Sequence, residues 1–194
     1  MKKLLSLMIV VGLSLASPAV WAAGDEAEPE TKKEASAAEK RAEMDKVAKE
    51  ALAEVLEKSE NAKELYGKAA GWAVFDNLRI TFILSGGGGT GVAVNKASGK
   101  RTYMKMGTAG LNLGLGAQVY QIVFLFEDGE TLNNFIEKGW KAETGADAAA
   151  GTAGAAVGTA FIDGIAVYKI TEAGLMASAD ISGTKYSLNK KLNE

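Results

Sequence analysis

The sequence predicts an α+β fold that is mainly β: N-terminal helices followed by a curved or barrel-like antiparallel sheet. Apolar residues recur at helical spacing between residues 44 and 56. After Gly71, about eight or nine short segments either alternate in polarity or are apolar throughout, as β-strands do. Because few residues separate these segments, little helix can lie between them, and this favours one curved antiparallel sheet.

Residues 1–22 have the pattern of a secretory signal peptide. Lys2 and Lys3 precede an uncharged, leucine-rich segment at residues 4–16, and Ala22 ends a stretch suited to cleavage. The alternative is an uncleaved anchor, but the apolar segment is shorter than the roughly 20 residues that a membrane-spanning helix needs. Cleavage after Ala22 predicts a periplasmic or secreted protein, which can also be peripheral to a membrane.

Residues 23–38 are rich in Glu, Lys, Ala and Ser and are predicted to form a flexible leader. Residues 39–60 are predicted to form an amphipathic helix, in which Glu54 and Lys58 stand four positions apart and stabilise it. Its apolar face consists of Met44, Val47, Ala48, Ala51, Leu52, Val55 and Leu56. This face either docks on the protein's own domain, which we favour, or binds a partner helix. The Glu-rich polar side disfavours a third alternative, contact with anionic lipid.

The β-rich domain is predicted at residues 61–192. A short helix, capped by Ser59 or Asn61, precedes strands at 72–75, 79–84, 91–96, 101–106, 111–115, 122–126, 164–170, 175–181 and 184–188. Residues 122–126 are apolar on both faces, which predicts a central strand. A further helix is predicted at residues 132–138. The uncharged segment 148–162 is predicted to pack against the sheet rather than to enter a membrane.

The composition excludes several classes of enzyme. The chain has no cysteine and no histidine, so it forms no disulfide, thiol nucleophile, histidine-dependent triad or ordinary zinc site. The remaining carboxylates and hydroxyls are not placed by a recognisable catalytic motif. We therefore predict a non-enzymatic protein without cofactor or metal. A formal net charge of −2 argues against a nucleic-acid partner.

A glycine-rich run at residues 85–91 contains the G-x-G-x-x-G spacing in Gly86, Gly88 and Gly91. A nucleotide site of this type needs a helix after the run and an acidic residue about 20 positions later. A strand pattern follows instead, and the next acidic residue is Glu127. We predict no nucleotide binding. The glycines are expected to permit bends and close backbone approach, so that valine at Gly88 or Gly91 lowers stability.

The middle of the chain lacks acidic residues. Residues 77–126 contain no Asp or Glu but include Arg79, Lys96, Lys100, Arg101 and Lys105. A hairpin turn at residues 97–100 would pair Lys96 with Arg101. Strand alternation would then separate two faces, one with Lys96, Arg101, Tyr103 and Lys105, the other with Ala93, Met104 and Met106.

This basic face has two interpretations. It is either a solvated outer surface or a surface that binds the anionic head groups of lipids, with Tyr103 at the membrane interface. The missing acidic residues favour the second. The predicted head-group contacts are Arg79, Lys96, Lys100, Arg101, Lys105 and Tyr103, and weaker candidates on the preceding short helix are Lys63 and Lys68.

Several segments occur in an order seen in one family of domains. Residues 69–75 look like an opening segment of small residues, glycine, apolar residues and Phe, and residues 85–94 look like a glycine-rich run that enters a valine strand. Residues 110–126 look like a Gly-x-x-x-Gly-x-Gly-Ala-Gln segment and a long apolar strand. Residues 144–151 resemble a Gly-Ala-Asp block, and residues 168–175 a closing Tyr-x-x-x-x-x-Gly-Leu.

In this order of segments, residues 61–192 resemble the SYLF domain family, also described as a bacterial lipid-binding or Ysc-type actin-regulator domain. Asp76 and Ala153 stand where the family usually has proline, and Ala177 where it has glycine, which suggests a divergent bacterial branch. Members bind membrane lipids, phosphoinositides in eukaryotes, and some bind actin. A periplasmic protein meets neither of these, so the resemblance implies binding of phospholipid or another amphiphile.

The sequence thus favours a non-enzymatic periplasmic protein that binds anionic phospholipid, or another envelope amphiphile, through a basic face. The alternative is a structural or protein-interaction module of the cell envelope that captures a partner through the helix at residues 44–56.

Overall fold

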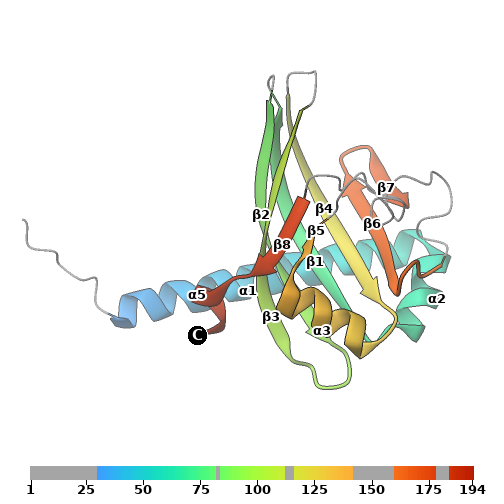
Figure 1. The fold of residues 1–194 in the computed structure, drawn as a ribbon, viewed down its shortest axis with the longest axis horizontal. Coiled ribbons are helices and arrows are strands. Elements are labelled where there is room, and N and C mark those ends of the chain that lie inside the picture. Colours follow the sequence, from blue (N-terminus) through green and yellow to red (C-terminus); the bar gives the residue numbers. More distant parts are fainter. Residues whose placement is uncertain (1–29, 82–83, 112–115, 142–159, 178–183) are drawn as a thin grey trace, which may run out of the picture.

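The computed structural model describes residues 30–81, 84–111, 116–141, 160–177 and 184–194 (Figure 1). The predicted signal peptide with its cleavage site at Ala22 lies outside these residues. Positions 112–115 of the strand predicted at residues 111–115 also lie outside them. The same holds for residues 148–159 of the apolar segment 148–162. None of the helices within the described ranges is both long enough and apolar enough to span a bilayer.

Two helices precede the sheet, as predicted. They are α1 (Glu30–Lys58) and α2 (Glu60–Lys68). The Ser59 side chain caps α2 by accepting a hydrogen bond from the backbone N–H of Ala62 at 3.1 Å. The flexible leader was predicted to extend to residue 38, and this is wrong from Glu30 onward. Its Ala, Glu and Lys residues are strong helix formers, which accounts for the earlier start of α1.

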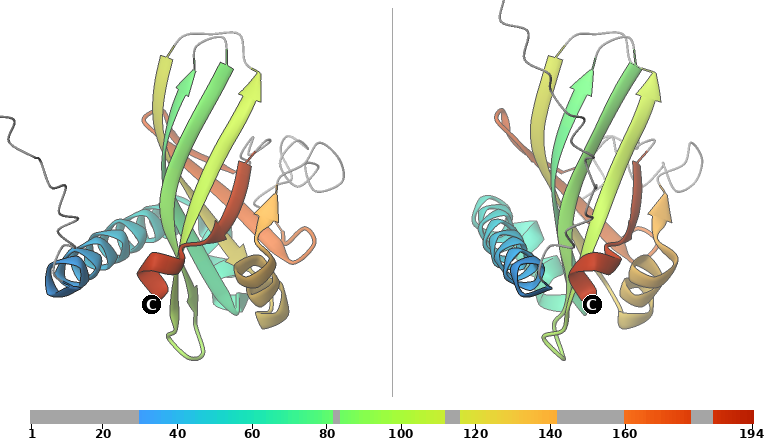
Figure 2. Two further views of the ribbon diagram at one scale, coloured as in Figure 1. Left: turned by 60° about the vertical axis from the view of Figure 1, so that its left-hand side comes forward. Right: turned by 90° about the vertical axis from the view of Figure 1, so that its left-hand side faces the viewer.

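The strands form one antiparallel sheet in the order β5-β8-β3-β2-β1-β4-β6-β7. Their bounds are β1 Gly71–Thr81, β2 Leu84–Asn95, β3 Arg101–Leu111, β4 Gly116–Phe126, β5 Trp140–Lys141, β6 Ile165–Thr171, β7 Gly174–Ala177 and β8 Thr184–Leu188. The remaining described helices are α3 (Gly129–Lys138) and α5 (Lys190–Asn193). This confirms the predicted α+β class. The sheet is curved and open, with β5 and β7 at its edges (Figure 2).

Strands β1 to β4 are longer than predicted. The segments predicted separately at 72–75 and 79–84 lie in one strand, β1, up to Thr81, and the glycine-rich run lies inside β2. No glycine of that run has a positive φ, so the expected sharp bends are wrong. Close approach is confirmed at two positions, because a Cβ at Gly89 or Gly91 would collide with the backbone of β1. Gly88 has ordinary space around it.

Helices α1 and α3 cover opposite faces of the sheet (Figure 2). On the α1 side, the predicted apolar face of the helix is buried at its centre, with Ala51 1% and Val55 0% exposed, and partly buried at Met44 and Leu56. It packs on strand residues that include Val74, Val92, Val123 and Tyr168. The prediction that this helix docks on its own domain is therefore confirmed.

The α3 side holds an aromatic cluster. Phe75 and Phe124 pack edge to face at 5.9 Å between ring centroids, and Tyr186 lies 4.7 Å from Phe75. Phe135 of α3 covers the cluster. The predicted central strand is also confirmed, because β4 pairs with β1 on one side and β6 on the other.

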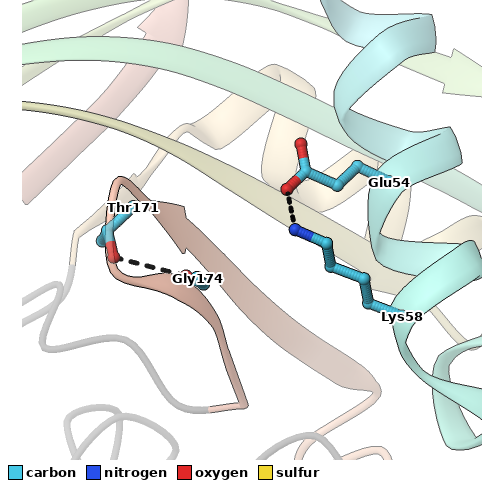
Figure 3. A network of polar contacts seen from close by, with 4 residues as sticks. All are labelled: Glu54, Lys58, Thr171 and Gly174. Atoms are coloured by element: carbon cyan, nitrogen blue, oxygen red, sulfur yellow. Dashed lines mark hydrogen bonds and ion pairs between the residues drawn. The ribbon is translucent and has the colours of Figure 1, made fainter.

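Polar contacts at the surface support these elements (Figure 3). Lys58 forms the predicted ion pair with Glu54 on α1, at 2.6 Å. In the hairpin between β6 and β7, the Thr171 hydroxyl donates a hydrogen bond to the carbonyl oxygen of Gly174 at 3.3 Å. An exposed ion pair of this kind contributes at most about 1 kcal/mol, so the fold depends mainly on its two apolar layers.

Candidate functional site

The hairpin of β2 and β3 differs by two residues from the predicted register. Arg101 pairs with Val94, whereas the sequence suggested Lys96. The Asn95 side chain accepts hydrogen bonds from Ser98, and Gly99 has a φ of 68°. These contacts make a longer turn, which removes Lys96 from the strand. Since the shift is even, the predicted alternation in β3 is retained: Arg101, Tyr103 and Lys105 face one side, and Met104 and Met106 face the other.

Lys96 contacts the short helix α2. Its Nζ donates a hydrogen bond to the Tyr66 carbonyl oxygen at 2.6 Å and lies 4.3 Å from the centroid of the Tyr66 ring. The two weaker candidates are also engaged on α2, Lys63 with Glu60 and Lys68 with Glu64. These lysines therefore stabilise the helix and the turn in the described structure.

Tyr103 does not lie at an exposed interface. Its ring belongs to the buried layer beneath α1, and its hydroxyl donates a hydrogen bond to Asp45 at 3.4 Å. Burial, and then the Asp45 carboxylate, raise the pKa of Tyr103. Its backbone N–H donates to the Asn193 side chain at 2.9 Å, and the Asn193 amide donates back to the Tyr103 carbonyl oxygen at 2.7 Å. Tyr103 thus joins α1 and α5 to the sheet, a role that sequence reasoning missed.

The predicted cations do not share one surface. Arg101 forms an ion pair with Asp45 of α1 at 3.4 Å, at the edge of the covered region. Lys100 is exposed in the turn, and Lys105 is exposed in the middle of β3. Arg79 lies in β1 between Gly87 and Gln118, toward the opposite end of the sheet from the turn. The continuous basic face expected from the sequence is therefore divided.

Farther from the turn than Asp76 and Lys105, the described residues on the α1 side of the sheet include an exposed set that carries no charge. Leu78 is 47% exposed and Val119 is 56% exposed, and the two residues are paired across β1 and β4. We call this region the uncharged sheet end; its described and exposed residues are Leu78, Gly86, Gly88, Gly107, Ala109 and Val119. Residues 107–126 contain no charged side chain. Strands β1 to β4 extend here well past α1 (Figure 1).

A second feature is a groove between α1, α5 and β2, which we call the α1–α5 groove. It consists of a cavity of about 460 Å³ and a smaller one of about 130 Å³, which share Glu43, Met44 and Thr90 in their linings. The larger cavity is also lined by Lys40, Asn189, Lys191 and Leu192, and the smaller by Val47, Ala48, Val74, Asp76 and Gly91.

The walls of the groove are held in place by long-range polar contacts. Arg41 of α1 donates a hydrogen bond to the carbonyl oxygen of Leu192 at 3.3 Å. The Asn189 backbone N–H donates to the Tyr103 carbonyl oxygen at 3.0 Å, and Asn193 bonds the same oxygen. The groove is therefore formed by elements that are fixed to one another.

Comparison with known proteins gives one match to a family model and one similar protein. The model of the Ysc84 family, described as Las17-binding protein actin regulator, matches residues 107–194. Beta cell expansion factor A of Aeromonas veronii is 41% identical over 166 residues, which cover 86% of this chain and 62% of that protein. Residues 107–194 therefore match the SYLF family, of which Ysc84 is the model.

The resemblance read from the sequence is thus confirmed, with the family model covering the C-terminal part of the predicted domain. The matched residues include β4 and the α5 wall of the groove, whereas α1, α2, β1 and β2 precede them. The chain spans 62% of the length of the relative named above. A SYLF domain is consistent with either lipid binding or protein interaction.

Proposed function

We propose that this protein is a non-enzymatic, periplasmic lipid-binding protein that attaches to the surface of anionic phospholipid membranes through the uncharged sheet end. The observation that carries the proposal is the exposed row Val119, Leu78, Gly88 and Gly107, which crosses four strands without a charge. Leu78 and Val119 are neighbouring exposed apolar side chains, and such groups mark membrane and protein contacts. The two glycines add no side chain to the row, so the backbone of β2 and β3 can approach a lipid surface closely.

The charges next to this row match a membrane geometry. Lys105 lies two positions before Gly107 on the same side of β3, which is about 7 Å along the strand. Interfacial segments bury their apolar face about 5–10 Å into the boundary of head groups and acyl chains. With Leu78 and Val119 at that depth, Lys105 would lie among the head groups. Asp76 is exposed beside the row as well, so the apolar contact is expected to dominate.

The alternative is a protein-interaction module. The description of the matching family supports it, because that description names binding to a protein. However, most of the apolar face of the helix at residues 44–56 is buried against the sheet. That helix would have to leave its own domain before it could capture a partner. Lipid binding needs no such rearrangement, and we therefore favour it.

Introducing charge into the exposed row is expected to abolish most membrane binding. The double variant Leu78→Glu/Val119→Glu should bind anionic vesicles about thirtyfold more weakly, since two half-exposed apolar side chains contribute about 2 kcal/mol on burial. The measurement is vesicle flotation, with circular dichroism to establish folding. Leu188→Glu is the matched control, because Leu188 is a comparably exposed residue, 37%, on β8. Equal flotation of the double variant and the wild type would contradict the proposal.

Among the lysines, Lys105→Gln is expected to weaken binding to anionic vesicles about fivefold, whereas Lys100→Gln leaves it unchanged. A lysine near an anionic surface contributes about 1 kcal/mol. Both side chains are exposed, but Lys100 lies in the turn at the far end of the hairpin. Flotation at low and high salt measures the difference, which should disappear with neutral vesicles. If Lys100 proves the more important residue, the membrane contacts the opposite end of the sheet.

A further inference from the structure

The α1–α5 groove combines an apolar floor with charged edges. Its floor is formed by Met44 and Leu192 and continues beneath α1 to Val74. The larger cavity, about 460 Å³, has the size of a site for a small organic molecule, roughly 300–1,000 Å³. An apolar floor of this kind suits a single alkyl chain rather than the surface of a bilayer.

The charges at the edge of the groove are of both signs. Lys40 of α1 and Lys191 of α5 line the larger cavity, together with Glu43. Within the described ranges, none of these three side chains takes part in an ion pair. Asp76 adds a second carboxylate at the smaller cavity. Two ammonium groups and two carboxylates therefore surround the groove, a pattern that matches a ligand with both a positive and a negative group.

We infer that the α1–α5 groove binds one molecule of a zwitterionic single-chain amphiphile of the lysophospholipid class. The alkyl chain lies along Met44, Val74 and Leu192. The phosphate is bound by Lys40 and Lys191, and the amine of the head group is bound by Glu43. This inference extends the proposed lipid binding from a membrane surface to a single molecule, and it depends on residues outside the uncharged sheet end.

The selectivity of the groove distinguishes this ligand from a simple fatty acid. Laurate has the same chain as lauroyl lysophosphatidylethanolamine but carries only a negative charge, which Glu43 repels. Isothermal titration of the purified protein, with each probe below its micelle concentration, is expected to give about fivefold tighter binding of the lysophospholipid. Glu43→Gln should weaken lysophospholipid binding and strengthen laurate binding. The preference for lysophospholipid over laurate should therefore be reduced or reversed. Glu50→Gln, farther along α1, is the matched control and should change neither.

The phosphate contact is tested on α5. Lys191→Gln is expected to weaken binding of both probes about fivefold, whereas Lys190→Gln, with the same charge change one residue away and outside the lining, leaves both unchanged. Tighter binding of laurate than of lysophospholipid by the wild type would overturn the inference. Equal effects at Lys190 and Lys191 would also overturn it.

Membrane attachment and groove binding can fail separately. The variants of Glu43 and Lys191 should float with anionic vesicles like the wild type, because neither residue belongs to the uncharged sheet end. Conversely, Leu78→Glu/Val119→Glu should retain binding of lysophospholipid. Loss of both properties in either set of variants would show that one surface performs both, which contradicts a separate groove site.

Discussion

Replacing Gly91 by valine is expected to lower the free energy of unfolding by about 3 kcal/mol or more, whereas Gly88→Val leaves it unchanged or raises it slightly. A Cβ at Gly91 would collide with the carbonyl oxygen of Val74 and the ring of Phe75, both buried in the sheet. A Cβ at Gly88 would meet only the Met106 carbonyl oxygen, at 3.6 Å, an ordinary contact. The two glycines belong to the same run, but they differ in the atoms that a Cβ at each position would meet.

Thermal unfolding followed by circular dichroism measures this difference. A loss of about 3 kcal/mol corresponds to a decrease in Tm of roughly 10 °C for a chain of this size. Gly91→Ala should also lower the Tm, because the collision involves the Cβ itself. Similar midpoints for the valine variants at Gly88 and Gly91 would show that β1 and β2 can separate enough to admit a side chain.

Raising the pH from about 9 to 12 is expected to remove about 2 kcal/mol of folding stability through Tyr168, with a further loss through Tyr186. Burial raises the pKa of Tyr168 from 10.0 to about 12. Burial, followed by the effect of Tyr120, raises the pKa of Tyr186 well above its ordinary value. In the unfolded chain these hydroxyls ionise near pH 10, so the unfolded state releases protons that the folded state retains. This stability is therefore complete below pH 10 and is lost as the pH rises through 12.

Urea unfolding at a series of alkaline pH values, with phenolate absorbance as the measure of ionisation, tests this expectation. Tyr168→Phe loses the hydrogen bond that the Tyr168 hydroxyl donates to Asn61 at 3.2 Å, which costs about 1 kcal/mol at neutral pH. Its stability should then decrease less steeply above pH 10 than that of the wild type. Parallel pH curves for the two proteins would mean that Tyr168 ionises as readily in the folded state as in the unfolded chain.

Local sequence patterns predicted the elements whose residues lie mainly in the apolar layers. The stripe from Met44 to Leu56 predicted the docked face of α1, and the apolar residues 122–126 predicted a central strand. Residues 184–188 were predicted with the bounds that β8 has. The start of α1 was missed because its Ala-, Glu- and Lys-rich tract is compatible with a soluble helix as well as with a flexible leader. Strand β1 was divided in the prediction because polar Asp76 and Asn77 interrupt its apolar pattern.

The candidate site was less accessible to sequence reasoning because its contacts are distant along the chain. Tyr103 looked exposed in an alternating strand, yet its partners Asp45 and Asn193 are 58 and 90 positions away. The two-residue error in the register of the hairpin arose from the Asn95 side chain, which extends the turn. The α1–α5 groove has no local signal at all, since its walls come from both ends of the described chain. The absence of acidic residues from 77–126 coincides with the uncharged sheet end. From the sequence alone, that absence was interpreted as evidence for a basic face.

The joining of α1 and α5 through Tyr103 also affects the order in which the chain can fold. Arg41 and Leu192, which bond to each other, are 151 positions apart, and contacts across such separations slow folding. During synthesis, α1 emerges early, but its hydrogen-bonded contacts with the C-terminal segment cannot form until residues 189–193 have been made. The nascent chain therefore remains incompletely folded for most of its translation, and an early α1 is available to chaperones or other proteins that bind unfolded polypeptides. Assembly of this side of the domain is expected to be a late step, after translation has passed residue 193.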